Sequence, residues 1–176
     1  QTTFEVTVNA LNESPTITAI DDQVINEDFS TSALAFTIGD AETAPESLIL
    51  SGSSSNTALV PNLNITFAGS GGSRTVTVTP EPNLSGVATI TVNVSDGVTT
   101  VPETFVVTVN AVNDLPTISG IANQNINEDT PTGSLAFTVG DVETAAASLT
   151  VTSTSGNLVL VPLASVVLGG SGASRT

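Results

Sequence analysis

The chain contains no cysteine, histidine, lysine, methionine, tryptophan or tyrosine among its 176 residues. Without cysteine, disulfide bonds cannot stabilise the fold. Without histidine, cysteine or lysine, an enzyme would lack its usual general bases and nucleophiles. A glycosidase needs only two carboxylates, but the absence of tryptophan and tyrosine removes the aromatic platforms on which sugars commonly stack. We therefore expect a protein that is not an enzyme.

Basic residues are almost absent as well. Arg74 and Arg175 stand against 17 acidic residues, which gives a formal net charge of −15. Nucleic acids and anionic membranes are bound through Lys and Arg side chains, so neither is expected as a partner. No apolar run reaches the roughly 18 residues of a transmembrane helix, and membrane insertion is not expected. The charge favours cations as partners, because carboxylates are hard oxygen ligands.

The residues that are present repeat without gaps at an offset of 101 positions. The segment FEVTVNA at 4–10 returns as FVVTVNA at 105–111, and INED at 25–28 returns as INED at 126–129. About 40 of 75 aligned positions are identical, far more than unrelated segments share. Such self-similarity at a fixed period is the signature of a tandem-repeat protein.

The phase of this repeat sets the expected domain boundaries. Residues 1–9 match the last strand of a preceding repeat, residues 10–110 form one complete repeat, and residues 111–176 form the first two-thirds of the next. We expect the chain to be a section of a longer polymer of repeats. The alternative is a self-assembling filament subunit whose incomplete sandwich is completed by a strand from a neighbouring chain.

Seven short segments of the complete repeat alternate apolar residues with Thr, Ser or Asn. They are 16–20, 33–38, 47–51, 64–67, 75–79, 88–94 and 104–109. Turn signals separate them, such as Gly-Ser-Gly-Gly at 69–72 and Asp-Gly at 96–97. This spacing predicts an all-β fold of tandem Greek-key β-sandwiches. No significant helix is expected, and 41–47 is predicted to be a loop because Pro45 interrupts its helix formers.

The acidic residues gather at the strand ends of the expected sandwich, where one repeat meets the next. For the junction inside the chain, the expected metal ligands are Glu27, Glu81, Asn113, Asp114, Asp141 and Glu143. For the junction above the complete repeat, they are Asn12, Glu13, Asp40, Glu42 and Asp96. Clustered carboxylates without basic partners repel one another, and Ca²⁺ takes roughly six to eight such oxygens. The sequence therefore predicts calcium at the junctions.

Each of these residues also has a purely structural interpretation. Asp and Asn commonly bond their own backbone in turns, and Asp96–Gly97 is a hairpin signal that needs no metal. For a single residue both interpretations stay open. The linker and the Asp-x-Glu loop favour a metal site, because both features recur in the two copies.

The acidic motifs resemble those of bacterial cadherin-like or immunoglobulin-like tandem repeats found in large surface adhesins and extracellular fibre proteins. The linker Asn-Asp-Leu-Pro at 113–116 is similar to a cadherin inter-domain segment. The Asp-x-Glu loops at 40–42 and 141–143 resemble the cadherin Asp-Ala-Asp loop, with Glu in place of the second Asp. Three further matches are Glu27 and Glu128, like the lone Glu of the first strand, and Asp96, like the Asp before the last strand.

Two departures from the cadherin pattern concern the ligands themselves. Glu13 replaces the linker Asp in the first copy, and Glu81 is placed only by its position in a turn, since the cadherin Asp-Arg-Glu element is absent.

The resemblance implies a role outside the cell. We expect a structural or adhesive repeat module of a bacterial surface or fibre protein, stiffened by calcium at its junctions, as in adhesion and biofilm formation. The expected partners are neighbouring repeats or identical chains, and cell-surface or matrix ligands. The expected location is secreted or on the bacterial cell surface.

Overall fold

A computed structural model describes residues 2–9 and 11–176, so the predicted start of the complete repeat at Ala10 lies outside the described residues, as does Gln1. The chain divides into two compact units, unit 1 ending at Val112 and unit 2 running from Asn113 to Thr176. The described residues are strands, turns and four three-residue 3-10 helices. None of these helices has the length or the apolar character needed to cross a membrane.

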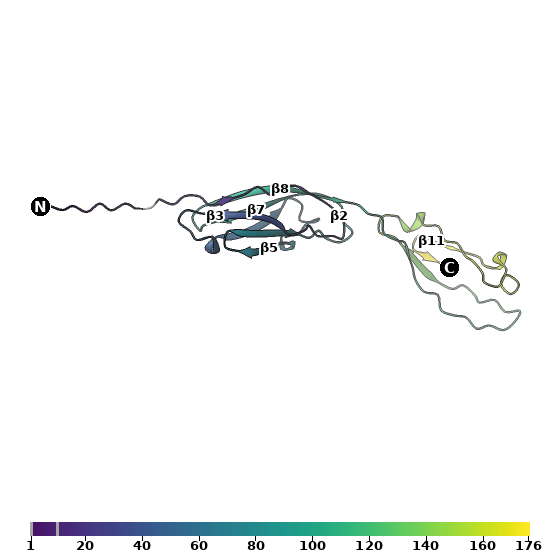
Figure 1. Ribbon diagram of the computed structural model, residues 1–176. Coiled ribbons are helices and arrows are strands. Elements are labelled where there is room, and N and C mark those ends of the chain that lie inside the picture. Colours follow the sequence, from purple (N-terminus) through teal and green to yellow (C-terminus); the bar gives the residue numbers. More distant parts are fainter. Residues whose placement is uncertain (1, 10) are drawn as a thin grey trace. The chain divides into compact units, whose positions relative to one another are not determined.

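Unit 1 is a sandwich of two four-stranded sheets (Figure 1). Its strands are β1 (Thr16–Ile17), β2 (Gln23–Asn26), β3 (Leu34–Gly39), β4 (Ile49–Ser54), β5 (Ile65–Ser70), β6 (Ser73–Val78), β7 (Gly86–Ser95) and β8 (Thr100–Asn110). One sheet has the order β1-β3-β6-β5 and the other β2-β8-β7-β4. If β1 and β2 are taken as one strand divided between the sheets, this is the Greek-key order of immunoglobulin-type sandwiches.

The strands bury alternate side chains between the two sheets. In β7, Ala88, Ile90, Val92 and Val94 are buried while the residues between them face outward. The rings of Phe36 and Phe67 meet edge to face at 6.5 Å between centroids. The core is therefore built mainly from Val, Ile and Leu, with few aromatic rings, as the period-two pattern predicts.

The observed strands match the seven predicted segments with shifted ends, and the all-β prediction is confirmed. The first predicted strand is wrong in length, because β1 covers only Thr16–Ile17. The chain then leaves for the other sheet, where β2 pairs in parallel with β8. The sequence prediction missed β2 altogether. The predicted loop at 41–47 ends in a single 3-10 turn, η1 (Pro45–Ser47), which Pro45 is able to begin.

Unit 2 forms one sheet with the order β11-β12-β10-β9. Its elements are β9 (Thr117–Ile118), β10 (Phe137–Gly140), β11 (Gly170–Ser171) and β12 (Ser174–Arg175), with 3-10 turns η3 (Ala146–Ser148) and η4 (Leu163–Ser165). The order repeats that of β5, β6, β3 and β1 in unit 1, where η2 (Asn62–Asn64) matches η4. Phe137 and Val139 are its buried hydrophobic residues among those described.

Residues 2–9 belong to no strand of the described structure, so the expected strand at 4–8 is not paired there. Phe4, Val6 and Val8 are 88%, 70% and 87% exposed. Their counterparts one repeat later, Phe105, Val107 and Val109, form the buried face of β8.

Candidate metal centre

Three segments of unit 1 meet at the end of the sandwich that receives the chain from residue 11. We call this end the N-terminal pole of unit 1, defined by Asn12, Glu13, Asp40, Glu42 and Asp96. The Asn12 side-chain amide donates to Asp96 Oδ2 at 2.9 Å. The Glu13 main-chain amide donates to Glu42 Oε2 at 3.0 Å. The structure thus joins the linker, the loop after β3 and the turn between β7 and β8.

Asp40 holds the loop after β3 in shape. Its Oδ1 accepts from the amides of Glu42 at 3.0 Å and Thr43 at 2.7 Å. This is the arrangement by which an Asp side chain imitates a helix cap in a turn. Its other oxygen, Oδ2, is buried and has no hydrogen-bond partner. A buried carboxylate oxygen without a partner is costly, so this atom is a place where a cation would stabilise the fold.

Asp96 closes the turn between β7 and β8. Its Oδ1 accepts from the amides of Val98 at 2.7 Å and Thr99 at 2.6 Å, and its Oδ2 accepts from the Thr99 hydroxyl at 3.0 Å. The amide of Thr99, then the side chain of Asn12, then the amide of Val98 hold the pKa of Asp96 well below its usual range. The carboxylate is therefore charged at any ordinary pH.

Unit 2 repeats two of these contacts with its own residues. The Asp114 amide donates to Glu143 Oε2 at 3.1 Å, as the Glu13 amide does to Glu42. The Thr144 amide donates to Asp141 Oδ1 at 2.7 Å, as the Thr43 amide does to Asp40. The Asn113 side chain donates to the Asp114 carbonyl. These four predicted ligands, Asn113, Asp114, Asp141 and Glu143, form the N-terminal pole of unit 2.

Glu27 and Glu81 lie in unit 1, where each has its own partner. Glu27 is 4% exposed, and its Oε1 accepts from the Val112 amide at 2.6 Å. Its own amide donates to the Asn110 carbonyl, so Glu27 is hydrogen-bonded both to the last residue of β8 and to Val112 after it. Glu81 Oε1 accepts from the Asn64 side chain at 3.3 Å.

The carboxylates of the poles serve first as acceptors for backbone amides. Within residues 2–9 and 11–176, no three acidic side chains lie close enough together to hold a metal ion as they stand. The donors are nevertheless of the right kind, because Asp, Glu and Asn oxygens are the hard ligands that Ca²⁺ prefers. Binding would require carboxylates such as those of Glu42 and Glu143 to turn from an amide towards the ion.

One residue at this end of unit 1 was missed by the sequence prediction. Arg74 Nη2 donates to the carbonyl of Pro45 at 3.1 Å, and Pro45 directly follows the loop that carries Asp40 and Glu42. Its recurrence as Arg175 in the segment Ser-Arg-Thr was the available signal, since these are the only basic residues in the chain.

Comparison with known proteins concerns the fold and not the poles. No protein-family model matches the sequence, and a comparison with curated proteins gives no match. Among solved structures, the chain is similar to a chimeric titin Z1Z2 carrying a decorin peptide, with a TM-score of 0.41, 16% identity, and coverage of 58% of this chain and 100% of that one.

Two further solved structures are similar to the same extent. Titin M4 gives a TM-score of 0.42 at 14% identity, over 57% of this chain and 100% of that one. The tandem Ig repeats of Dlar give 0.42 at 14% identity, over 61% of this chain and 55% of that one. Likeness at this level carries no information about function.

Proposed function

We propose that this chain is part of a structural or adhesive repeat protein of a bacterial surface or extracellular fibre, in which calcium at the poles of the repeats limits their movement. The observation that carries the proposal is the buried, unpartnered Oδ2 of Asp40 at a pole joined by hydrogen bonds. Two of the pole contacts, from the linker amide to the loop Glu and from the loop Thr amide to the loop Asp, recur in unit 2, as a repeated mechanical element would require.

Calcium would supply the positive charge that the poles lack. The residues that would hold it are Asn12, Glu13, Asp40, Glu42 and Asp96 at the N-terminal pole of unit 1, and Asn113, Asp114, Asp141 and Glu143 at the N-terminal pole of unit 2. Each N-terminal pole combines a linker segment with a loop of the sandwich. An ion bound to both would reduce the freedom of the linker, because ligands from separate segments become tied to one centre.

A calcium titration by calorimetry tests this proposal directly. We expect heat of binding for the chelator-treated chain, and a higher melting temperature in calcium than in chelator, because a ligand that binds only the folded state stabilises it. The variant Asp40→Asn should lose most of the effect at its pole, whereas Glu46→Gln, at an exposed acid next to the same loop, should retain it. Absence of both heat and a melting shift in the unchanged chain would refute the calcium part.

The location and the partners are argued from repetition and surface chemistry. Repeats in tandem along the chain, with Thr, Ser and Asn on the outer faces of β7 and β8, suit a spacer that reaches away from a cell. The partners would be neighbouring repeats and, beyond them, cell-surface or matrix ligands. Antibody labelling of intact bacteria that produce the protein would test the location, and labelling seen only after lysis would contradict it.

The exposed apolar segment at 2–9 favours a second candidate function, a filament subunit. Phe4, Val6 and Val8 match the buried face of β8 residue for residue, yet they are 88%, 70% and 87% exposed. Presented to another copy, this segment would pair as a donated strand. Sedimentation of the chain over a wide concentration range tests this, with Val6→Asp as the disruptive variant and Thr7→Asp, on the other side of the segment, as its control. A monomer at all concentrations would exclude it.

A further inference from the structure

Arg74 and Arg175, the basic residues of the chain, lie at the same point of the matching β-hairpin in each unit. Arg74 Nη1 donates to the Gly69 carbonyl and Nη2 to the Pro45 carbonyl, both at 3.1 Å. Arg175 repeats this, with Nη1 to Gly170 at 3.4 Å and Nη2 to Ala146 at 2.9 Å. All these acceptors are main-chain carbonyls, of strands β5 and β11 and of the first residues of η1 and η3, and none of them is a carboxylate.

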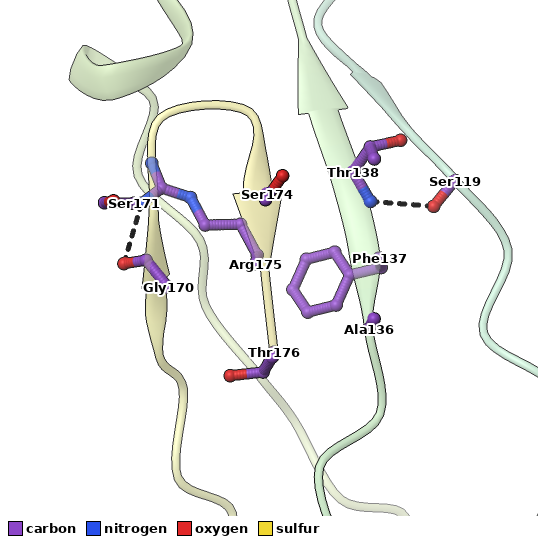
Figure 2. A pocket seen from close by; sticks show the side chains of 9 residues that line it. All are labelled: Ser119, Ala136, Phe137, Thr138, Gly170, Ser171, Ser174, Arg175 and Thr176. Carbon is purple, nitrogen blue, oxygen red and sulfur yellow. Dashed lines mark hydrogen bonds between the residues drawn. The ribbon is translucent and has the colours of Figure 1, made fainter.

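In each unit one carbonyl acceptor lies in the β-hairpin, and the other lies directly after the acidic loop. In unit 2, Gly170 is the first residue of β11, which forms the hairpin with β12. Ala146 is the first residue of η3 and directly follows the loop that carries Asp141 and Glu143. Figure 2 shows the Arg175 side chain crossing the hairpin to the Gly170 carbonyl. A shallow depression of about 510 Å³ surrounds it, and nine matching positions line one of about 550 Å³ around Arg74.

The hairpin is hydrogen-bonded to the end of the neighbouring strand of its sheet, which is β3 in unit 1 and β10 in unit 2. The Ile38 amide donates to the Gly72 carbonyl at 2.9 Å, and the Val139 amide donates to the Ala173 carbonyl at 2.9 Å. Strand β3 ends at Gly39, and Asp40 follows at once. The hairpin therefore fixes the start of the acidic loop through the Ile38 amide and its end through Arg74.

We propose that Arg74 and Arg175 are positioning residues, which hold the acidic loops 40–44 and 141–145 in the shape that presents their carboxylates to a cation. The presentation of carboxylates to a cation rests on the proposed calcium function, whereas the effect of the arginines on the shape of the loops does not. A guanidinium suits the task because its planar fork reaches two carbonyls at once, whereas a lysine ammonium is a single point charge on a flexible stem.

Amide exchange followed by NMR on the labelled chain tests the positioning role without calcium. The amides of Glu42 and Thr43 in unit 1 and of Thr144 in unit 2 report on the loops, because Asp40 and Asp141 hold them. In chelator, Arg74→Met should raise exchange at Glu42 and Thr43 by about tenfold or more, the change expected for one lost charge-assisted hydrogen bond. Arg74→Lys should give nearly the same result, because charge alone cannot replace the fork.

The second copy supplies the matched control. Arg175→Met should raise exchange at Thr144 and leave Glu42 and Thr43 unchanged, and Arg74→Met should do the reverse. Unchanged exchange at the loop amides in both variants would overturn the inference. An equal rise over β7 and β8 in Arg74→Met would also overturn it, since that would indicate loss of the whole sandwich.

A calcium titration of the same samples connects the role to the proposed site. If the unchanged chain binds calcium, Arg74→Met should lower the calcium affinity reported by the Glu42 and Thr43 amide signals by about tenfold. The affinity reported by the Thr144 amide signal should stay the same. Equal affinity at both loops in Arg74→Met would overturn the link to calcium. If the unchanged chain binds no calcium, the proposed function fails, while the exchange data in chelator still decide whether Arg74 positions the loop.

Discussion

Asp96 shows how one side chain serves both a turn and a contact between segments. Its carboxylate accepts from the amides of Val98 and Thr99 within its own turn, and from Asn12 in the linker. Asp-Gly predicts a hairpin turn from sequence alone, and that structural interpretation is correct here. The contact with Asn12 shows that the same residue both closes a turn and binds the linker.

The depressed pKa of Asp96 gives a prediction for acid stability. Because its pKa is lowered in the fold, the charged form contributes stability above the unfolded pKa of about 4, and this is lost as pH falls through the folded pKa. We expect Asp96→Asn to melt at a lower temperature than the unchanged chain at pH 7, in chelator, with the difference shrinking below about pH 4.

Thermal melts of both chains between pH 7 and pH 2 would measure the effect. Glu46→Gln is the control, because Glu46 is exposed on the surface of unit 1. A difference for Asp96→Asn that stays constant over the whole range would show that the charge of Asp96 plays no part.

The hairpin between β5 and β6 is the element on which the acidic loop depends. Gly69 lies there at φ +93°, and a Cβ atom added to it would be 2.4 Å from the Ser73 carbonyl oxygen. Gly170 repeats both features at φ +87° and 2.4 Å. The recurrence shows that the backbone, and not an adjustable side chain, limits the residue type at this position.

Replacing Gly69 with Ala should therefore destabilise unit 1 by about 3 kcal/mol, the upper end of the range for strained backbone positions, because the clash adds to the conformational cost. Gly71→Ala is the matched control, since Gly71 also has a positive φ of 56° but no atom within 4 Å of an added Cβ. Denaturant unfolding measures both variants, and the control should lose no more than about 1–2 kcal/mol, the conformational cost alone. An equal loss for the two would show that the close approach at Gly69 is relieved by a small backbone shift.

Local pattern predicts the elements of this fold better than it predicts their partners. The strand at 88–94 was readable from its alternation, because both of its faces are decided by immediate neighbours in the sheet. Strand β2 was missed because Gln23–Asn26 carries only a short alternation, and its partner β8 lies some eighty residues later. The poles are readable as clusters of acids, but which amide each acid accepts depends on loop conformations that the pattern does not contain.

At the scale of the whole chain, identical residues in the two repeats have different surroundings. Leu59 and Val60 in unit 1 are 3% and 0% exposed. Leu160 and Val161, in the same Leu-Val-Pro sequence of unit 2, are 77% and 43% exposed. Sequence similarity alone predicts the same burial for each pair. The difference arises because a second sheet covers the residues in unit 1, whereas the described part of unit 2 has one sheet.

The two leucines therefore make a matched test of how the units are stabilised. Leu59→Ala should cost unit 1 roughly 2–5 kcal/mol, as for other buried leucines. Leu160→Ala should cost less than about 0.5 kcal/mol, as for a surface site. Amide exchange resolved by unit measures both. If copies of the chain instead complete one another's sandwich, Leu160 becomes buried on association, and Leu160→Ala should then lower stability and shift the sedimentation profile together, in proportion to protein concentration. A cost at Leu160 that matches Leu59 without any dependence on concentration would contradict both the surface assignment and the filament proposal.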